Sequence, residues 1–226
     1  MGLVKFNSIK DAHDQYKEQT FTDDSIIFFK YNKNIIIING EKFNFKITTK
    51  NDYKLGKLLF ERINMNDIRI GSGFDVHKFK KGNTLTIFGV NIPFNKSLEG
   101  HSDADVGFHS IVDAILGALC KGDIGNHFPP NEDKWKDKAS IFFMTHAKNL
   151  LMKENYKIKN LDITLICEKP KVSEYKTEFI TSISQALNID KNIVNVKGTT
   201  TEKLGFLGRE EGIACQVSVI IASYEY

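Results

Sequence analysis

The stretch DADVGFHSIVDAILGALCKG, residues 103–122, decides the fold class because it reads as one long amphipathic helix. Its apolar residues recur at helical spacing, at Val106, Ile111, Ile115 and Leu119. Gly122 lies beyond the last of them, where glycine commonly ends a helix. Ser102 or Asp103 is the predicted N-cap, since a short polar side chain there can accept a backbone hydrogen bond. What the apolar stripe packs against depends on the flanking segments.

Strand-like segments surround this helix, and further helical segments alternate with them. Strands are predicted at 68–76, 84–94, 158–170, 193–203 and 212–224, and helices at 140–156 and 172–189. We therefore predict an α/β (α+β) domain in which a mixed β-sheet carries its helices on one side. The last strand, 212–224, is apolar along most of its length and is expected to be buried on both faces.

The first 66 residues differ from the rest in composition. They are rich in Lys, Asn, Ile and Phe and contain no Pro or Cys. Asn39-Gly40 stands between two β-prone runs and predicts a hairpin over 34–47, and residues 53–63 predict a short helix. We predict an N-terminal extension over 1–66 and a main domain over 67–226.

The bulk properties exclude several classes of protein. The chain has 226 residues and a formal net charge of +3, with basic and acidic residues interspersed, so nothing favours nucleic acid as a partner. Every apolar run, including the isoleucines at 35–38, is too short to span a membrane, and no secretory signal is visible at the start. Cys120, Cys167 and Cys215 are scattered, which predicts reduced thiols.

Three residues suggest a metal site. Asp75 and His77 are two apart in a predicted strand and so project from the same face. His109 lies on the predicted helix, with Asp105 at i−4 and Asp113 at i+4 on its face, where either carboxylate could orient the imidazole. One Asp and two His suit zinc and leave a fourth position open for a substrate.

Three other segments carry residues that suit anionic ligands. His101 and Ser102 precede the predicted helix start, which favours anions. Asp123 lies in a loop flanked by glycines, where a backbone can approach a ligand closely. The stretch GTTTEKLGFLGREEG, 198–212, offers three hydroxyls and Glu202 to phosphates and a hard cation.

Three stretches together resemble a known family. RIGSGFDVHKF (69–79), GHSDADVGFHSIVDAILGALCKGDIGNHFP (100–129) and KGTTTEKLGFLGREEGIAC (197–215) resemble 2-C-methyl-D-erythritol 2,4-cyclodiphosphate synthases of the non-mevalonate isoprenoid pathway. The resemblance covers 69–226 and leaves 1–66 outside. It implies that 4-diphosphocytidyl-2-C-methyl-D-erythritol 2-phosphate is cyclised with release of CMP. It also implies a homotrimer around a threefold axis, with active sites at the subunit interfaces.

The resemblance implies a role for each matching residue. Asp75, His77 and His109 match zinc ligands, Glu202 matches the ligand of a second divalent cation (Mg²⁺ or Mn²⁺), and His101 and Thr200 match the catalytic pair. Substrate contacts are implied for Ser102, Asp123, Ile124, Gly125, Phe128, Pro170, Lys171, Thr199 and Thr201. Phe206 and Arg209 match residues near the threefold axis, where the family can hold an isoprenoid diphosphate.

The sequence departs from the family pattern at two places. Pro130 stands where the family usually has an Asp that contacts the erythritol, and Asn131, Glu132 and Asp133 are the candidates to replace it. Val172-Ser173 replaces larger apolar residues in the cytidine pocket. Two alternatives stay open: a zinc-dependent phosphoesterase, and a non-catalytic trimer that binds an isoprenoid diphosphate. The N-terminal extension suggests that the protein is located in a plastid-type organelle (apicoplast or chloroplast stroma). The alternative location is the bacterial cytoplasm.

Overall fold

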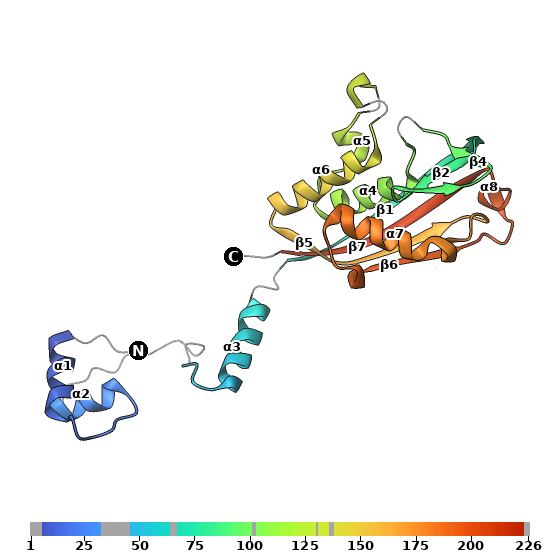
Figure 1. The fold of residues 1–226 in the computed structure, drawn as a ribbon. Helices are drawn as coiled ribbons and strands as arrows, with labels where there is room; N and C mark the ends of the chain where they lie inside the picture. Colours follow the sequence, from blue (N-terminus) through green and yellow to red (C-terminus); the bar gives the residue numbers. More distant parts are fainter. Residues whose placement is uncertain are drawn as a thin grey trace. The chain divides into compact units, whose positions relative to one another are not determined.

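A computed structural model describes residues 6–32, 46–63, 67–100, 103–129, 131–135 and 138–223 (Figure 1). The chain forms two compact units, residues 1–54 and 55–226, and each is described by itself. The predicted domain boundary between residues 66 and 67 stays a prediction. In the described ranges, no helix has the length and hydropathy that crossing a bilayer requires.

The smaller unit contains two packed helices, α1 (Phe6–Gln15) and α2 (Asp24–Asn32). Ala12 and Ile27 are buried between them. Lys30 reinforces the pair, because its Nζ donates to Gln19 Oε1 at 2.6 Å. The predicted hairpin falls largely on residues 33–45, outside the described residues. Helix α3 (Lys50–Ile63) confirms the predicted helix over 53–63.

The larger unit is built on a five-stranded sheet of order β4-β1-β7-β5-β6. Its strands are β1 (Ile68–Lys81), β4 (Lys96–Leu98), β5 (Tyr156–Ile166), β6 (Val194–Thr199) and β7 (Gly212–Ser223). The β5–β6 pair is parallel and the other pairs are antiparallel, so the predicted mixed sheet is confirmed.

The predicted single strand over 84–94 is wrong. It is a hairpin of β2 (Thr84–Ile87) and β3 (Val90–Pro93), paired antiparallel. Phe88 and Gly89 have φ values of 51° and 72°, and this left-handed backbone reverses the chain between the two strands.

Three long helices cover one face of the sheet, as predicted (Figure 1). They are α4 (Val106–Ala118), α6 (Ser140–Lys153) and α7 (Val172–Leu187). Shorter turns connect them to the strands: α5 (Ile124–His127), α8 (Gly205–Gly208) and the 3₁₀ helices η1 (Asp133–Trp135) and η2 (Lys191–Ile193). The core lies between these helices and the sheet, with Phe88, Phe108 and Phe179 among its largest fully buried side chains.

Helix α4 lies directly against β1 because two glycines leave room for it. A Cβ on Gly73 would stand 2.0 Å from the carbonyl oxygen of Ser110, and one on Gly71 would stand 1.9 Å from that of Ala114. The predicted N-cap of this helix is wrong: Asp105 occupies the position, and its carboxylate accepts from the amides of Gly107 and Phe108. The helix therefore starts later than the sequence pattern indicated.

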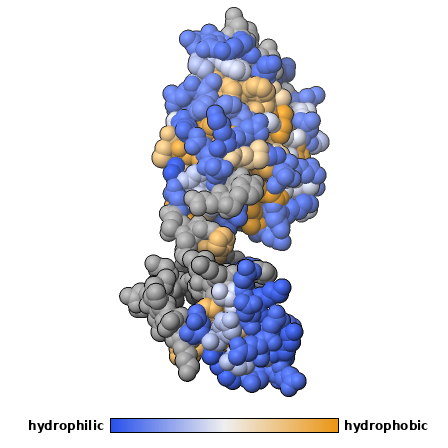
Figure 2. Space-filling view, turned by 90° about the vertical axis from the view of Figure 1, so that its left-hand side faces the viewer, coloured by the Kyte–Doolittle hydropathy of each residue, from blue (hydrophilic) through white to orange (hydrophobic). Residues whose placement is uncertain are grey.

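The opposite face of the sheet is open. Ile70 and Phe74 of β1 are 73% and 59% exposed, and in β7 the cross-strand neighbour of Phe74, Gln216, is exposed too. The prediction that β7 is buried on both faces is therefore wrong for the single chain, because the polar side chains of β7 face solvent. Figure 2 shows apolar surface of the larger unit, in orange, among hydrophilic residues.

Candidate active site

Asp75, His77 and His109 come together, as the sequence predicted. Asp75 and His77 project from the helix-covered face of β1, and His109 faces them from α4. Asp75 Oδ2 lies 2.9 Å from His77 Nε2 and 3.3 Å from His109 Nδ1, and the two nitrogens are 3.2 Å apart. Three potential ligand atoms therefore converge on one point.

Each of these side chains is held on its outer atom. Asp75 Oδ1 accepts from the amide of Val76 at 2.8 Å. His77 Nδ1 lies 2.8 Å from the carbonyl oxygen of Glu99 and donates to it. His109 Nε2 lies 3.0 Å from Ser140 Oγ. These contacts leave Oδ2, Nε2 and Nδ1 to face inward, an arrangement that fits a divalent metal with histidine and carboxylate ligands.

Electrostatics in the cluster favour a carboxylate next to imidazoles. Burial alone would raise the pKa of Asp75, but hydrogen bonds and charges from His109 and His77 outweigh it and lower that pKa. Burial would lower the pKa of His77, yet its contacts with Asp75 and Glu99 raise it. A negatively charged, partly desolvated ligand set attracts a cation.

The two carboxylates predicted to orient His109 make other contacts. Asp105 is fully buried and accepts from the amides of Phe88 and Gly89, at 2.8 and 2.6 Å, besides capping α4. Asp113 accepts from the amide of Ile124 at 2.8 Å. Their role in orienting His109 stays a prediction. Sequence reasoning missed Ser140, which is 31 residues from His109 in the chain and carried no signal of its own.

The loop after α4 carries the predicted erythritol contacts. Asp123 caps α5 through its hydrogen bond from Asn126 N, and Ile124 and Gly125 form the first turn. Phe128 is buried against Phe143, with ring centroids 4.7 Å apart, so its side chain serves the core. Glu132 pairs with Lys134, an oxygen-to-nitrogen distance of 2.5 Å. His101, Ser102 and Pro130 lie outside the described residues.

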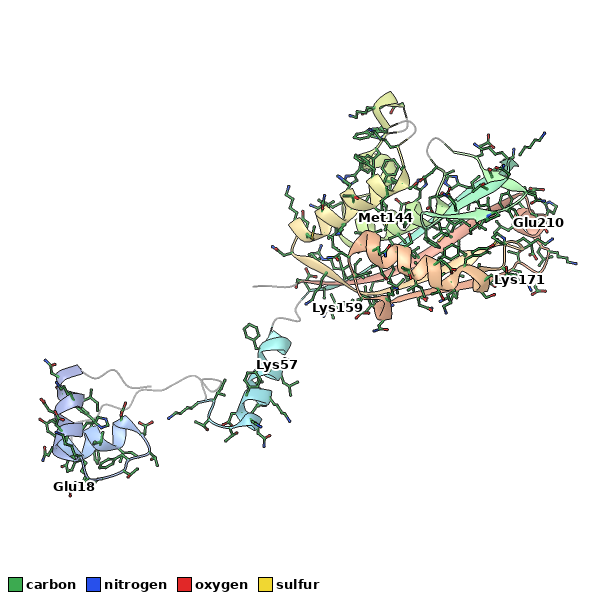
Figure 3. The ribbon with its side chains drawn as sticks, in the orientation of Figure 1. Glu18, Lys57, Met144, Lys159, Lys171 and Glu210 are labelled. Atoms are coloured by element: carbon green, nitrogen blue, oxygen red, sulfur yellow. The ribbon has the colours of Figure 1, made fainter. Side chains whose placement is uncertain are left out.

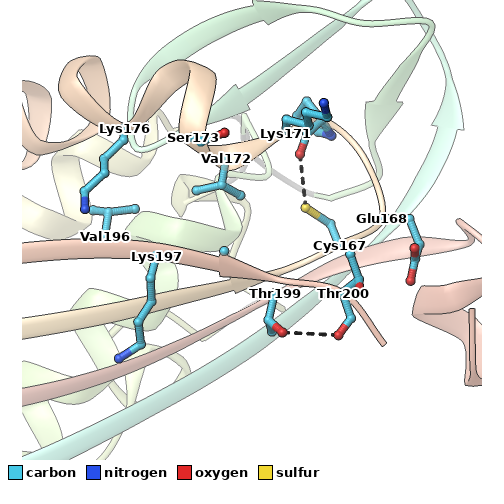
Figure 4. Close-up of a pocket in the computed structure, with 12 residues that line it drawn as sticks. Cys167, Glu168, Lys171, Val172, Ser173, Lys176, Val196, Lys197, Thr199 and Thr200 are labelled. Atoms are coloured by element: carbon cyan, nitrogen blue, oxygen red, sulfur yellow. Dashed lines mark hydrogen bonds between the residues drawn. The ribbon is translucent and has the colours of Figure 1, made fainter. Parts of the chain in front are cut away.

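A cavity of about 400 Å³ lies between β6, the start of α7 and the end of β5 (Figure 4). Its lining includes three predicted substrate contacts, Pro170, Lys171 and Thr199, and the predicted catalytic residue Thr200. Lys176 and Lys197 line it as well, and sequence reasoning missed both. Lys171 lies at the start of α7 (Figure 3). Lys197 is paired with Asp162, so Lys171 and Lys176 stand against one acidic lining residue, Glu168, and this balance suits an anionic ligand.

The turn after β6 brings the remaining predicted residues near this cavity. Glu168, which sequence reasoning also missed, accepts from the amide of Thr201 at 3.1 Å and so fixes the turn. Thr200 Oγ1 and Glu202 Oε1 are 3.5 Å apart, and Glu202 is exposed. Beyond the turn, Phe206 is 44% exposed and Arg209 pairs with Glu211 at 2.7 Å.

The fold and the cluster define an α+β protein with a candidate metal centre and a separate basic cavity. The profile of the YgbB family matches residues 68–222, and the chain belongs to this family. A curated relative from Wolbachia pipientis wMel, named bifunctional enzyme IspD/IspF, is 47% identical over 229 residues, covering 99% of this chain and 56% of its own length. The chain thus spans about half the length of the curated relatives it matches.

Two solved structures are similar. One, described as IspF of Plasmodium falciparum in complex with CDP, is 43% identical with a TM-score of 0.63, covering 71% of this chain and 99% of its own. The other, the bifunctional IspDF of Campylobacter jejuni, is 36% identical with a TM-score of 0.68, covering 97% of this chain and 58% of its own. Similarity to bifunctional proteins thus extends into the N-terminal extension. The curated relatives are bacterial, which gives no support to a plastid location.

Proposed function

We propose that the chain catalyses the cyclisation of 4-diphosphocytidyl-2-C-methyl-D-erythritol 2-phosphate, with release of CMP. The observation that carries this proposal is the convergence of Asp75, His77 and His109 on one point, in a unit that also holds a basic cavity. The similar Plasmodium falciparum protein, described as a CDP complex, supports a cytidine diphosphate ligand. For location we propose the bacterial cytoplasm, in line with the bacterial relatives.

The reaction needs positioning and charge neutralisation more than covalent catalysis, because the 2-phosphate itself attacks the β-phosphorus. Zinc on the three inward atoms would supply Lewis-acid stabilisation of the β-phosphate. A second cation, Mg²⁺ or Mn²⁺, would be held by the exposed carboxylate of Glu202. Lys171 and Lys176 attract the diphosphate, and Thr200 with His101 stabilises the charge that develops during transfer.

We further propose a homotrimer whose active sites are shared between neighbouring subunits. In one chain Asp75, Cys215, Leu165 and Gly198 form one row across the sheet. At about 4.8 Å per strand, this places the metal cluster and the nucleotide cavity roughly 14 Å apart. The apolar open face of the sheet, with Ile70 and Phe74, supplies a surface for association. Phe206 and Arg209 would then line a threefold cavity for an isoprenoid diphosphate.

The test is incubation of the protein with the cytidine substrate and Mg²⁺. We expect CMP and the cyclic diphosphate in equal amounts. A Thr200→Val variant should bind zinc normally and lose most turnover, because it lacks the hydroxyl beside the transferred group. Hydrolysis of simple phosphate esters without CMP would instead identify a zinc phosphoesterase. Ligand binding without turnover would identify a non-catalytic trimer.

A further inference from the structure

His109 is held by the side chain of Ser140, which is held in turn by the carboxylate of Asp103. His109 Nε2 lies 3.0 Å from the hydroxyl of Ser140, the first residue of α6, which is fully buried. The same hydroxyl donates to a carboxylate oxygen of Asp103. The amide of Ser140 donates to both oxygens of Asp103, at 3.1 Å each. Asp103, Ser140 and His109 therefore form one hydrogen-bonded chain.

The direction of these hydrogen bonds settles which nitrogen of His109 carries the proton. A serine hydroxyl has one hydrogen to donate, and Ser140 gives it to the carboxylate of Asp103. Its oxygen must then accept from His109, so the imidazole proton sits on Nε2. In the neutral imidazole, the form that binds a metal, the lone pair is then on Nδ1, the nitrogen that faces Asp75 and His77. That tautomer is the one a metal in the cluster requires.

We propose that Ser140 and Asp103 are positioning residues that fix the tautomer and the ring orientation of His109 for metal binding. The proposal rests on the metal centre of the proposed function. His77 is oriented differently, by the backbone carbonyl of Glu99, which no substitution of a side chain removes. Side chains outside the cluster therefore influence the metal affinity chiefly through His109.

Asp103 also ties the metal centre to helix α6. The N-cap residue of α6, Ala139, makes no capping hydrogen bond through its side chain. The carboxylate of Asp103 caps the helix in its place and lies at the positive end of the helix dipole. In the sequence Asp103 directly follows His101 and Ser102, the residues predicted to act on the substrate. One carboxylate thus caps α6 and, through the hydroxyl of Ser140, holds a candidate metal ligand.

The test compares zinc affinity, measured by competition with a chromogenic chelator, with the absorption spectrum of the Co²⁺-loaded protein. Ser140→Ala should weaken zinc binding about 10- to 100-fold and alter the Co²⁺ bands, because His109 loses its anchor. Ser140→Thr keeps the hydroxyl and should restore both readouts. Asp103→Asn keeps a hydrogen-bond acceptor for folding and should weaken zinc binding about tenfold, at the low end of that range.

Ser182→Ala is the matched control. Ser182, on α7, donates its hydroxyl to the carbonyl oxygen of Phe88 at 2.5 Å and is not part of the metal cluster. Loss of the Ser182 hydroxyl should leave zinc affinity and the Co²⁺ spectrum unchanged. Thermal unfolding of the metal-free proteins checks that every variant folds. Wild-type zinc affinity and Co²⁺ bands in Ser140→Ala would overturn the proposal, as would an equal loss in Ser182→Ala. A wild-type protein that binds zinc but releases no CMP would overturn the proposed reaction alone.

Discussion

The metal cluster and the nucleotide cavity differ in how firmly a single chain holds them. The side chains of His77 and His109 are only 14% and 15% exposed, and each has its outer nitrogen engaged. Thr200 and Glu202 are exposed, and the long hydrogen bonds between them measure 3.4 and 3.5 Å. One half of the proposed site is therefore complete before any ligand arrives, while the other half still has polar groups to satisfy.

The difference follows from the elements that carry each half. The candidate metal ligands lie on a long strand and a buried helix, and the register of β1 with β7 fixes the positions of Asp75 and His77. Glu202 and Lys203 lie in a turn with φ values of 53° and 62°, held mainly by Glu168. A rigid metal half beside an exposed nucleotide half fits a site that closes on substrate or on a neighbouring subunit.

Removing a ligand from the rigid half should have the largest effect. His77→Ala deletes one of three inward atoms, and we expect zinc affinity and turnover to fall together by more than about 100-fold, beyond the loss expected for an orienting residue. Elemental analysis of the purified variant measures its zinc content. A full zinc complement would remove His77 from the ligand set.

The next effect is expected where α4 lies closely against β1. Gly73→Ala places a Cβ 2.0 Å from a backbone oxygen, so we expect a loss of about 3 kcal/mol in the free energy of unfolding. Gly117→Ala is the control on the same helix, because its Cβ would meet only Ser72 O at 3.8 Å. It should raise stability by up to about 1 kcal/mol. Urea denaturation that shows equal effects would contradict the packing account.

A smaller effect is expected in the exposed half. Glu202→Gln removes the charge that a hard cation prefers, so the Mg²⁺ concentration for half-maximal turnover should rise about tenfold, equivalent to about 1.4 kcal/mol. Zinc content should not change, because Glu202 is not part of the metal cluster. An unchanged Mg²⁺ titration would remove Glu202 as the ligand of the second cation.

The smallest effect is expected outside both halves. A chain that starts at Asp67 lacks the extension but keeps every predicted site residue. We expect it to fold and to turn over substrate within about twofold of the full chain, a difference of about 0.4 kcal/mol. Loss of activity in a folded truncation would show that residues 1–66 contribute to the site.

The sequence predicted most of the fold because its apolar periodicity is strong. The three long helices and the mixed sheet follow from that pattern, which burial on one face imposes. It failed at 84–94, where left-handed backbone at Phe88 and Gly89 turns a continuous β-prone run into a hairpin. The sequence pattern also placed the N-cap of α4 too early, because aspartate is equally favoured as an N-cap at residue 103 and at residue 105.

For the site, the sequence predicted the three converging metal ligands from strand alternation and helix spacing. The partners that hold these ligands could not be found in this way. Ser140 reaches His109 only through the packing of α6 on α4, and Glu168 reaches the turn at Thr201 across the sheet edge. These two contacts arise from tertiary packing, and neither Ser140 nor Glu168 belongs to a residue pattern that marked a site in the sequence.

Mixing two inactive variants tests the contrast between the halves most directly. The His77→Ala variant has a defective metal half and the Glu202→Ala variant has a defective nucleotide half. Each variant alone should therefore be nearly inactive. Unfolded together in equal amounts and reassembled, they should regain activity at about a quarter of the sites, if neighbours in a closed ring assort at random. Mixed assemblies that form but stay inactive would show that both halves come from one subunit, and would contradict the shared site.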